Sequence, residues 1–284
     1  MNTEHVFAAP GKLNLFLHVI GRRPDGYHEL QTLFRFIERA DRIGLSVRSD
    51  GAIRRVNHVP GVEPDSDLAV RAARALQVAT GCPLGADIRV EKHLPMGGGL
   101  GGGSSDAATV LLGLNHLWGT GLDRAALQAL GLRLGADVPV FLFGRNAFAE
   151  GVGERLQAFD PGAAWYLVLT PPVAVSTAAV FASPHLTRHG SAITITALSR
   201  GWRHGWGRND LQSVVRDEVV EVHRALSWLE QFGPARMTGS GACVFCGFAT
   251  EASARAALAQ VPEGLSGFVA RGLDEHPLRA LAAD

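Results

Sequence analysis

The sequence predicts an α+β fold with two domains. The chain has 284 residues, of which 46% are hydrophobic and 19% charged, a composition that can bury a sizeable core. Apolar residues recur at strand-like and at helix-like spacing, and the two kinds of segment mix without the strict alternation of a doubly wound sheet. A turn-forming stretch at Asp160-Pro161-Gly162 predicts the division, with domains at residues 1–160 and 161–284.

The first domain is expected to open with strands and to continue with helices. Strand-like apolar patterns cover Val6–Ala9, Leu13–Ile20, Glu29–Ile37, Ile43–Arg48 and Ala86–Glu91. Helical patterns cover Asp67–Thr80, Asp106–Trp118 and Asp123–Leu134. Gly81 and Pro83 end the first of these helices, and Ser104 and Ser105 are expected to cap the second.

The second domain continues the mixture of strands and helices. Strands are expected at Tyr166–Leu169, Ala242–Phe248 and Gly267–Arg271, and a short helix at Glu251–Gln260. The longest helical pattern runs over Leu211–Phe232 and is stopped by Gly233-Pro234.

Charge and hydropathy exclude several classes of protein. The net charge is zero and no basic block occurs, which argues against a nucleic-acid binder. No apolar run has the length of a membrane span, and Met1–Val6 lacks the pattern of a signal peptide. We therefore expect a cytoplasmic protein with neither nucleic acid nor membrane as a partner.

The cysteines and histidines do not predict a metal or redox site. Cys243 and Cys246 form a C-x-x-C pattern inside an apolar strand, where positions three apart face opposite ways, so packing thiols are expected. His185 and His189 have helical spacing, but Pro184 and Gly190 flank them and no acidic pattern completes a ligand set.

A glycine cluster predicts a phosphate-binding loop. Six of the seven positions of Gly97–Gly103 are glycine, between an expected strand and an expected helix. Backbone N–H groups free of side chains, together with the positive end of a helix, form an anion site that suits a triphosphate. Ser104 and Ser105 add hydroxyl groups, and Lys92 adds a nearby positive charge.

The loop alone does not identify a reaction. The G-x-x-x-x-G-K-[ST] pattern of P-loop proteins is absent, as are the His-Arg-Asp and Asp-Phe-Gly signatures of protein kinases. Gly97, Gly99 and Gly102 fit G-x-G-x-x-G, but Asp123, at the spacing of the ribose-binding acid, begins a helix instead of ending a strand.

Three segments together resemble the GHMP kinase superfamily. Pro95–Ala107 is similar to its phosphate-binding motif, Ala9–Leu15 to its first motif and Met237–Ala242 to its glycine-rich third motif. Further segments resemble a branch whose acceptor is a diphosphocytidyl sugar alcohol: Gly21–Leu30, Gly135–Phe141, Gly151–Glu154 and Asn209-Asp210-Leu211.

The resemblance implies a kinase with ATP and a small-molecule acceptor in the cleft between its two domains, acting in the non-mevalonate route to isoprenoid precursors. It implies Asp137 as the base and Lys12 as the residue that polarises the acceptor hydroxyl. Implied acceptor contacts are Asn14, Tyr27, His28, Thr177 and Phe181. Implied ATP contacts are Asp67, Lys92, Pro95, Met96, Gly97, Gly98, Gly99, Leu100, Gly101, Gly102, Gly103, Ser104 and Ser105.

Two alternatives and one departure stay open at this point. The chain fits less well as a GHMP kinase for mevalonate, homoserine or a sugar, or as a nucleotide sensor or dinucleotide enzyme that makes no catalytic use of Lys12 and Asp137. Asp67 stands where relatives carry an adenine-contacting asparagine, and an ionised carboxylate has no proton to donate. Asp67 would equally serve as a helix N-cap. We expect Mg²⁺ to arrive with ATP, and a homodimer stays open.

Overall fold

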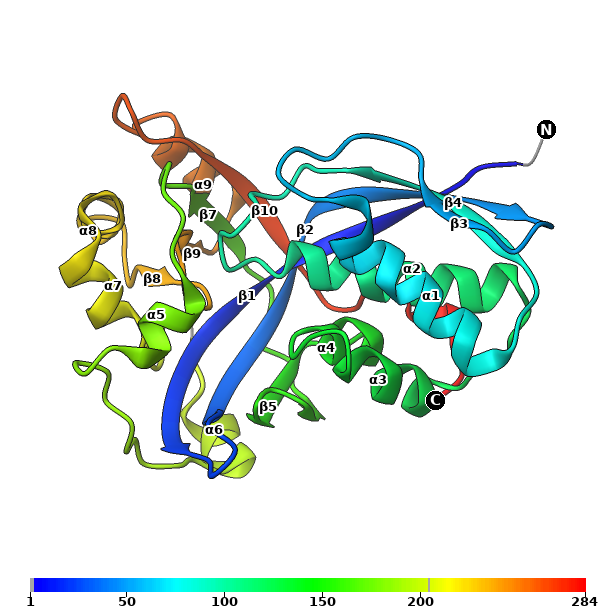
Figure 1. The fold of residues 1–284 in the computed structure, drawn as a ribbon. Helices are drawn as coiled ribbons and strands as arrows, with labels where there is room; N and C mark the ends of the chain where they lie inside the picture. The colour runs from blue at the N-terminus through cyan, green and yellow to red at the C-terminus, as the bar shows by residue number, and fades with distance from the viewer. Residues whose placement is uncertain (1–2, 204) are drawn as a thin grey trace.

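The computed structural model describes residues 3–203 and 205–284. Two groups of helices flank a ribbon made by the long strands β1 and β2 (Figure 1). The strands are β1 His5–Arg22, β2 His28–Arg48, β3 Ile53–Arg55, β4 Gly85–Glu91, β5 Ala147–Gly151, β6 Arg155–Ala158, β7 Trp165–Leu169, β8 Arg236–Met237, β9 Val244–Phe248 and β10 Gly267–Leu273. The helices are α1 Leu68–Thr80, α2 Gly102–Leu117, α3 Arg124–Leu132, α4 Val138–Phe143, α5 Thr177–Ala182, α6 Ile195–Gly201, α7 Gln212–Glu218, α8 Val220–Leu229 and α9 Glu251–Leu258, with 3₁₀ turns at Pro64–Ser66 and Arg279–Leu281.

The four strands expected over residues 6–48 merge into two. β1 runs on through Pro10 and Gly11, where the register with β2 shifts. Proline has no N–H for the ladder, so a bulge at this point lets the strand continue past it. Further shifts between Asn14 and Leu17 and between Val19 and Gly21 bend the ribbon, which therefore crosses from one group of helices to the other.

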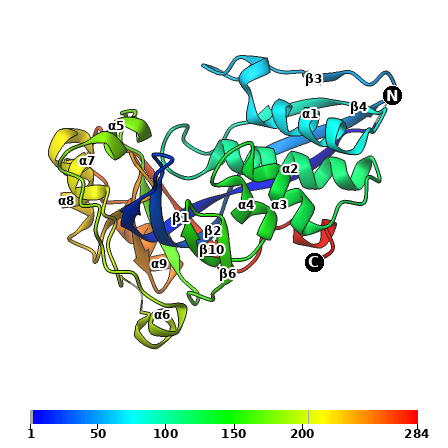
Figure 2. The same ribbon diagram turned by 60° about the horizontal axis from the view of Figure 1, so that its bottom comes forward.

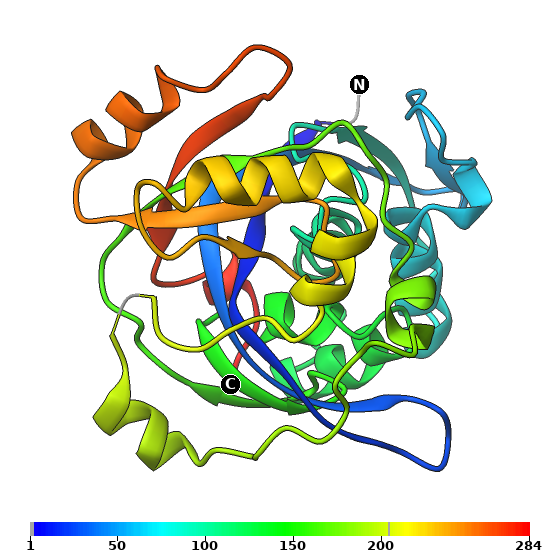
Figure 3. The same ribbon diagram turned by 90° about the vertical axis from the view of Figure 1, so that its left-hand side faces the viewer.

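One mixed sheet connects the two groups, and the predicted α+β class is confirmed. β2 pairs antiparallel with β1, β4, β5 and β10, and β10 continues the sheet to β7, β9 and β8. Helices α1–α4 lie on one side of the ribbon, and α5, α7 and α8 lie on the other (Figures 1 and 2). In Figure 3, α8 crosses in front of β9, against which it packs.

The hydrophobic interior is divided in the same way. One cluster lies between α1–α4 and the first strands, and two others lie among β1, β7, β9 and helices α6–α9. The C-terminal residues return to the first cluster, where Ala282 packs and Asp284 pairs with Arg124 at 2.5 Å. The division at residue 160 stays a prediction, because β1 and the C-terminal residues each pack outside their own half.

Two expectations about helices are wrong. α2 begins at Gly102 with Gly101 as its N-cap, so Ser104 and Ser105 lie inside its first turn and do not cap it. The helix expected over Leu211–Phe232 is two helices, because Val219 has extended dihedral angles (φ −125°, ψ 101°) between α7 and α8. Two adjacent β-branched valines at this break, Val219 and Val220, favour that interruption. Asp67 accepts from the Ala69 N–H as an N-cap, as expected, and Asp123 caps α3 in the same way.

Candidate active site

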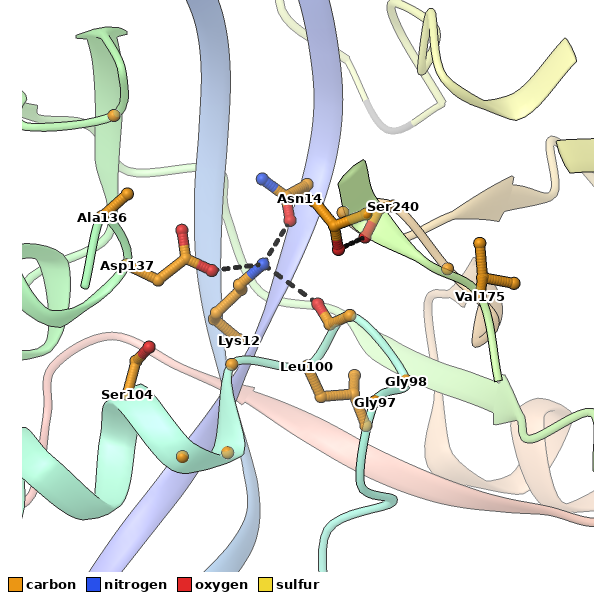
Figure 4. A pocket seen from close by; sticks show the side chains of 18 of the residues that line it. Lys12, Asn14, Gly97, Gly98, Leu100, Ser104, Ala136, Asp137, Val175 and Ser240 are labelled. Carbon is orange, nitrogen blue, oxygen red and sulfur yellow. Dashed lines mark hydrogen bonds and ion pairs between the residues drawn. The ribbon is translucent and has the colours of Figure 1, made fainter. Parts of the chain in front are cut away.

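A cavity of about 1030 Å³ lies between the two groups of helices. Its walls come from the middle of β1 and β2, the glycine loop before α2, the start of α4, and α5. In Figure 4, the side chains of Lys12 and Asn14, from β1, and of Asp137, from the start of α4, point toward one another. Every site residue expected from the sequence lines this cavity except Ser105.

Lys12 lies at the centre of the site. Its ammonium lies 3.1 Å from Asp137 Oδ2, and it donates to Asn14 Oδ1 at 2.6 Å and to the Gly99 carbonyl at 3.0 Å (Figure 4). The side chain is 3% exposed and passes over the Phe34 ring at 5.5 Å. Three oxygen partners therefore fix a buried cation between the expected base and the glycine loop.

Asp137 stands at the N-terminus of α4 with its carboxylate free of the helix. It occupies the N-cap position but caps no backbone N–H, and Pro139 follows in the first turn. Its side chain is 35% exposed, about ten times more than that of Lys12. The carboxylate therefore faces the cavity, where it is available to a ligand.

Asn14 holds Lys12 in place. Its Oδ1 accepts from Lys12, and its Nδ2 donates to Thr32 Oγ1 at 2.9 Å. The Asn14 backbone N–H donates to Thr238 Oγ1 at 3.0 Å, which ties β1 to the third glycine-rich segment. Both functional groups of the amide thus have partners within the protein, and its direct contact with an acceptor stays a prediction.

The glycine loop packs against the third glycine-rich segment. The Cys243 N–H donates to the Gly98 carbonyl at 3.1 Å, and Thr238 Oγ1 donates to the Gly99 carbonyl at 3.2 Å. Gly99 has φ of +78°, and a Cβ there would overlap the carbonyl oxygen of Thr238. Glycine is therefore required at this position by both its backbone angle and its neighbour.

The N-terminus of α2 faces the same cavity. No side chain caps it, so its first N–H groups and the positive end of the helix dipole are available to an anion. Ser104 lines the cavity beside them. Ser105 is fully buried and its hydroxyl lies away from the cavity, which corrects the expectation that both serines reach the phosphates. The reason is helix geometry, since neighbouring residues face directions about 100° apart.

Lys92 is paired with two acids, so its charge is already compensated. Its ammonium contacts Asp41, and it lies 2.7 Å from Asp106 Oδ2. Burial alone would lower the pKa of Lys92, but Asp106 and Asp41 raise it. Burial raises the pKa of Asp106 to about 7, against the attraction of Lys92. The cluster anchors the first turn of α2 to β2, because Asp106 lies on α2 and Asp41 on β2.

Asp67 serves as a helix cap and an ion-pair partner. Its carboxylate accepts from the Ala69 N–H at 2.9 Å and lies 2.7 Å from Arg55. It also lines the cavity, on the side where Val59, Leu68 and Val90 supply apolar walls. The structure therefore supports the N-cap interpretation, and a contact with adenine stays a prediction.

The other end of the cavity is aromatic. Tyr27 is 63% exposed at the β1–β2 turn, and His28 opens β2. The ring of Phe181 on α5 stacks on the His28 ring, with centroids 4.9 Å apart and planes at 26°. Thr177, also on α5, shares a hydrogen bond of 2.6 Å with Ser240. Four of the five acceptor residues expected from the sequence, Tyr27, His28, Thr177 and Phe181, thus line this end of the cavity, whereas Asn14 lies beside Lys12.

Several residues that complete the site are not among the predicted site residues. Thr238 joins Asn14 to the glycine loop, and Asn209 Nδ2 donates to the carbonyls of Met237 and Gly239 at 2.8 Å. Both lie in segments that resemble family motifs, and this resemblance is the signal that could have pointed to them. Arg188 contacts both members of the His28–Phe181 stack. An isolated arginine has no recognisable spacing, so only the assembled fold reveals its contacts.

The thiols of Cys243 and Cys246 are buried in the interior, as expected from the sequence. Cys243 and Cys246 are free, buried and in different hydrophobic clusters, as opposite faces of a strand require. Burial raises the pKa of the Cys243 thiol to about 12 and of the Cys246 thiol to about 11.

Among residues 3–203 and 205–284, no three His, Cys, Asp or Glu side chains gather as a metal site. No helix of these same ranges has the length and apolarity to cross a membrane.

Comparison with known proteins supplies the family. The GHMP kinase N-terminal domain family matches residues 67–145, and the GHMP kinase C-terminal family matches residues 189–267. The 4-diphosphocytidyl-2-C-methyl-D-erythritol kinase of Thiobacillus denitrificans is 62% identical over 97% of this chain and 98% of its own. The enzyme of the same name from Burkholderia mallei is 53% identical, with 97% and 96% covered.

A solved structure agrees with these relatives. A crystal structure of 4-(cytidine 5'-diphospho)-2C-methyl-D-erythritol kinase is 35% identical, with a TM-score of 0.81, and the match covers 94% of this chain and 99% of that one. The two-domain GHMP kinase fold expected from the motifs is therefore confirmed. With the paired Lys12 and Asp137 beside a phosphate-type glycine loop, these similarities establish that the chain belongs to the 4-diphosphocytidyl-2-C-methyl-D-erythritol kinase family of the GHMP kinases.

Proposed function

We propose that this chain transfers the γ-phosphoryl group of ATP to the 2-hydroxyl of 4-diphosphocytidyl-2-C-methyl-D-erythritol. The observation that carries the proposal is the position of Lys12. Its ammonium joins the carboxylate of Asp137 to the carbonyl of Gly99 in the glycine loop. The expected base and the expected phosphate site therefore lie against a single buried cation, as an in-line transfer between a hydroxyl and a nucleotide requires.

Asp137 accepts the proton of the acceptor hydroxyl in this proposal. As the hydroxyl oxygen forms its bond to the γ-phosphorus, the bond from that phosphorus to the bridging oxygen breaks and ADP leaves. Lys12 keeps Asp137 ionised and polarises the attacking oxygen. Asn14 keeps the ammonium in position through its contact of 2.6 Å. Alignment and charge neutralisation supply most of the acceleration in such a reaction, with little covalent chemistry.

The nucleotide lies along the glycine loop with its phosphates at the N-terminus of α2. The first N–H groups of α2 and the hydroxyl of Ser104 are the donors for the phosphate oxygens. Asp67 and the apolar residues around it form the end that would hold the base. Mg²⁺ comes bound to the ATP phosphates. Lys92 contributes by holding the first turn of α2 through Asp106.

The cytidine end of the acceptor lies at the aromatic end of the cavity. Tyr27 offers an exposed ring for stacking on a pyrimidine, and His28, Phe181 and Thr177 line the wall around it. The metabolic role of the relatives supports a cytoplasmic location, since both substrates are charged and do not cross a bilayer unaided. A homodimer stays a prediction for solution measurement.

The test is an ADP-release assay with a panel of acceptors. The purified chain is given ATP and, in turn, the diphosphocytidyl compound, free methylerythritol, mevalonate and homoserine. We expect the diphosphocytidyl compound to exceed each of the others in kcat/KM by at least about 100-fold, since its cytidine contributes binding energy that the others lack. A preference for mevalonate or homoserine would contradict the proposed acceptor and leave only the kinase class. ADP release with no acceptor dependence would contradict phosphoryl transfer to an alcohol.

A further inference from the structure

Arg188 makes contacts that its place in the sequence does not predict. It lies between α5 and α6, in a segment that runs past the aromatic end of the cavity. One terminal nitrogen donates to the carbonyls of Phe181 at 2.9 Å and Ser183 at 2.7 Å, and the other donates to the Leu186 carbonyl at 3.1 Å. The guanidinium therefore satisfies carbonyls at the C-terminal end of α5, where a cation is also favoured by the helix dipole.

The remaining nitrogen of Arg188 reaches across to β2. Its Nε–H donates to His28 Nε2 over 3.3 Å. The same side chain thus contacts the backbone of Phe181 and the ring of His28, the two residues whose rings stack 4.9 Å apart. The arginine therefore ties α5 directly to the first residue of β2.

This contact fixes the protonation of the His28 ring. A guanidinium has only donors, so the His28 nitrogen that faces it must accept, which leaves Nε2 without a proton. The ring is then neutral and carries its proton on Nδ1, the reverse of the tautomer that free histidine prefers. The environment supports a neutral ring, because burial lowers the pKa of His28 and the charges of Arg188 and Arg22 lower it further.

We propose that Arg188 is a positioning residue for the pyrimidine end of the acceptor: it holds His28 as the neutral Nδ1–H tautomer and keeps its ring stacked on Phe181. The acceptor then contacts a preformed wall, in which the neutral His28 ring offers its Nδ1–H as a hydrogen-bond donor and carries no positive charge. A preformed wall lowers the ordering cost of binding, so Arg188 contributes to acceptor affinity and not to the chemical step. This inference rests on the proposed function for its kinetic part only.

The first measurement needs no substrate and no variant of Arg188. ¹⁵N spectra of the full chain labelled at histidine are recorded near neutral pH, and His28 is identified as the signal pair that disappears in His28→Gln. We expect a protonated nitrogen at Nδ1 and an unprotonated nitrogen at Nε2. A His28 ring with its proton on Nε2, or one protonated at both nitrogens, overturns the proposal whatever any variant does.

The second measurement separates affinity from chemistry. Arg188→Met removes every hydrogen bond of the side chain, and we expect the KM for the diphosphocytidyl acceptor to rise about 3- to 10-fold, the factor for one lost hydrogen bond. The kcat and the KM for ATP should stay within about twofold of wild type, and His28 should return toward the Nε2–H tautomer. Arg188→Lys keeps a charge and a donor and should rescue part of the KM. Arg200→Met, at an exposed position on α6, is the matched control and should change nothing.

The outcomes distinguish this inference from the proposed function. A wild-type chain that does not phosphorylate the diphosphocytidyl acceptor contradicts the function and leaves the tautomer measurement to stand alone. An active wild-type chain with an unchanged acceptor KM in Arg188→Met contradicts the inference and leaves the function intact. Should Arg188→Met fail to fold by circular dichroism, the same comparison is made with Arg188→Ala, which also removes the donor to His28 and whose unchanged KM and unchanged His28 signals would overturn the inference.

Discussion

The ammonium of Lys12 lies 3.1 Å from the carboxylate of Asp137. The two residues are far apart in the sequence, because Lys12 lies on β1 and Asp137 comes immediately before α4. The pair is asymmetric, because Lys12 is buried and Asp137 faces the cavity with a third of its side chain exposed. A buried cation beside an accessible carboxylate suits a general base, since the carboxylate must reach the substrate hydroxyl to take its proton.

Asp137→Asn tests that role while it preserves the shape of the side chain. We expect kcat to fall by about 10²–10⁴-fold, the usual loss when a general base is removed, with ATP affinity close to wild type. Steady-state kinetics and calorimetry with ATP are the measurements. Asp217→Asn, at an exposed position on α7, is the matched control and should leave both quantities unchanged. An Asp137→Asn variant that keeps more than half of the wild-type turnover excludes Asp137 as the base.

The second prediction concerns ATP binding by the glycine loop, and its effect can be separated from the cost of backbone strain. Gly99→Ala forces a Cβ onto the Thr238 carbonyl, so the loop must move away from the third glycine-rich segment. We expect ATP affinity to fall at least about tenfold, equivalent to 1.4 kcal/mol, because the N–H groups of the loop lose their arrangement. Gly119→Ala is the control: φ there is +64°, and no heavy atom lies within 4 Å of the Cβ position.

Both alanines carry the cost of about 1–2 kcal/mol for a left-handed backbone, so both should lower the free energy of unfolding. Only Gly99→Ala should weaken ATP binding, as measured by calorimetry on the folded variants. Equal ATP affinities for the two variants would mean that the loop is a linker without a role in nucleotide binding.

Local chemistry made some features of the fold predictable. The ends of α1, α3 and α9 follow from Asp67, Asp123 and Thr250, whose side chains accept from the first turn as N-cap residues do. The phosphate-type glycine loop is also recognisable from the sequence, since six of seven positions between a strand and a helix are glycine. The family motifs also predict that Lys12 and Asp137 share one cleft, and both residues line the same cavity.

Other features depend on contacts between distant segments, which no local pattern encodes. Ser104 and Ser105 are good capping residues, but the close packing of the loop lets α2 start earlier, at Gly102. Arg188 is the clearest case, because its significance comes only from the ring of His28, 160 residues away.

The buried histidine His276 predicts a dependence of stability on pH. It lies against the rings of Phe36 and Phe141, and its Nδ1 accepts from the Leu278 N–H at 3.1 Å. Burial lowers its pKa to about 3, and the charge of Arg124 acts in the same direction. The unfolded chain takes up this proton near pH 6.5 and the folded chain does not, so stability falls as pH falls below 6.5.

Between pH 7 and pH 5 this one group should remove about 2 kcal/mol from the free energy of unfolding, at about 1.4 kcal/mol per pH unit below 6.5. His276→Gln keeps an acceptor for Leu278 and cannot be protonated, so its loss over the same interval should be smaller by that amount. Urea unfolding at pH 7, 6 and 5 measures both proteins. Burial also lowers the pKa of His18 and of His28, so a smaller slope should remain. Parallel curves for wild type and variant would contradict the assignment.

The exposed ring of Tyr27 distinguishes this acceptor from those of other GHMP kinases. Tyr27 is 63% exposed at the β1–β2 turn, lines the cavity and packs little against the protein, so its removal should cost almost no stability. A ring held ready at the rim of a binding site is suited to stack on the cytosine, and stacking of a base on an aromatic side chain is worth roughly 1–3 kcal/mol.

Tyr27→Ala should therefore lower kcat/KM for the diphosphocytidyl acceptor by about 5- to 150-fold, with the KM for ATP unchanged. Tyr27→Phe keeps the ring and is the matched control, with kcat/KM expected within about twofold of wild type. Free methylerythritol, which has no base, should be a very poor acceptor for all three proteins, because remote binding energy supports the alignment of the reacting hydroxyl. Steady-state kinetics with both acceptors decides. If the alanine variant uses the diphosphocytidyl acceptor as well as wild type does, Tyr27 does not stack on the base, and the cytidine must be recognised by the His28–Phe181 wall alone.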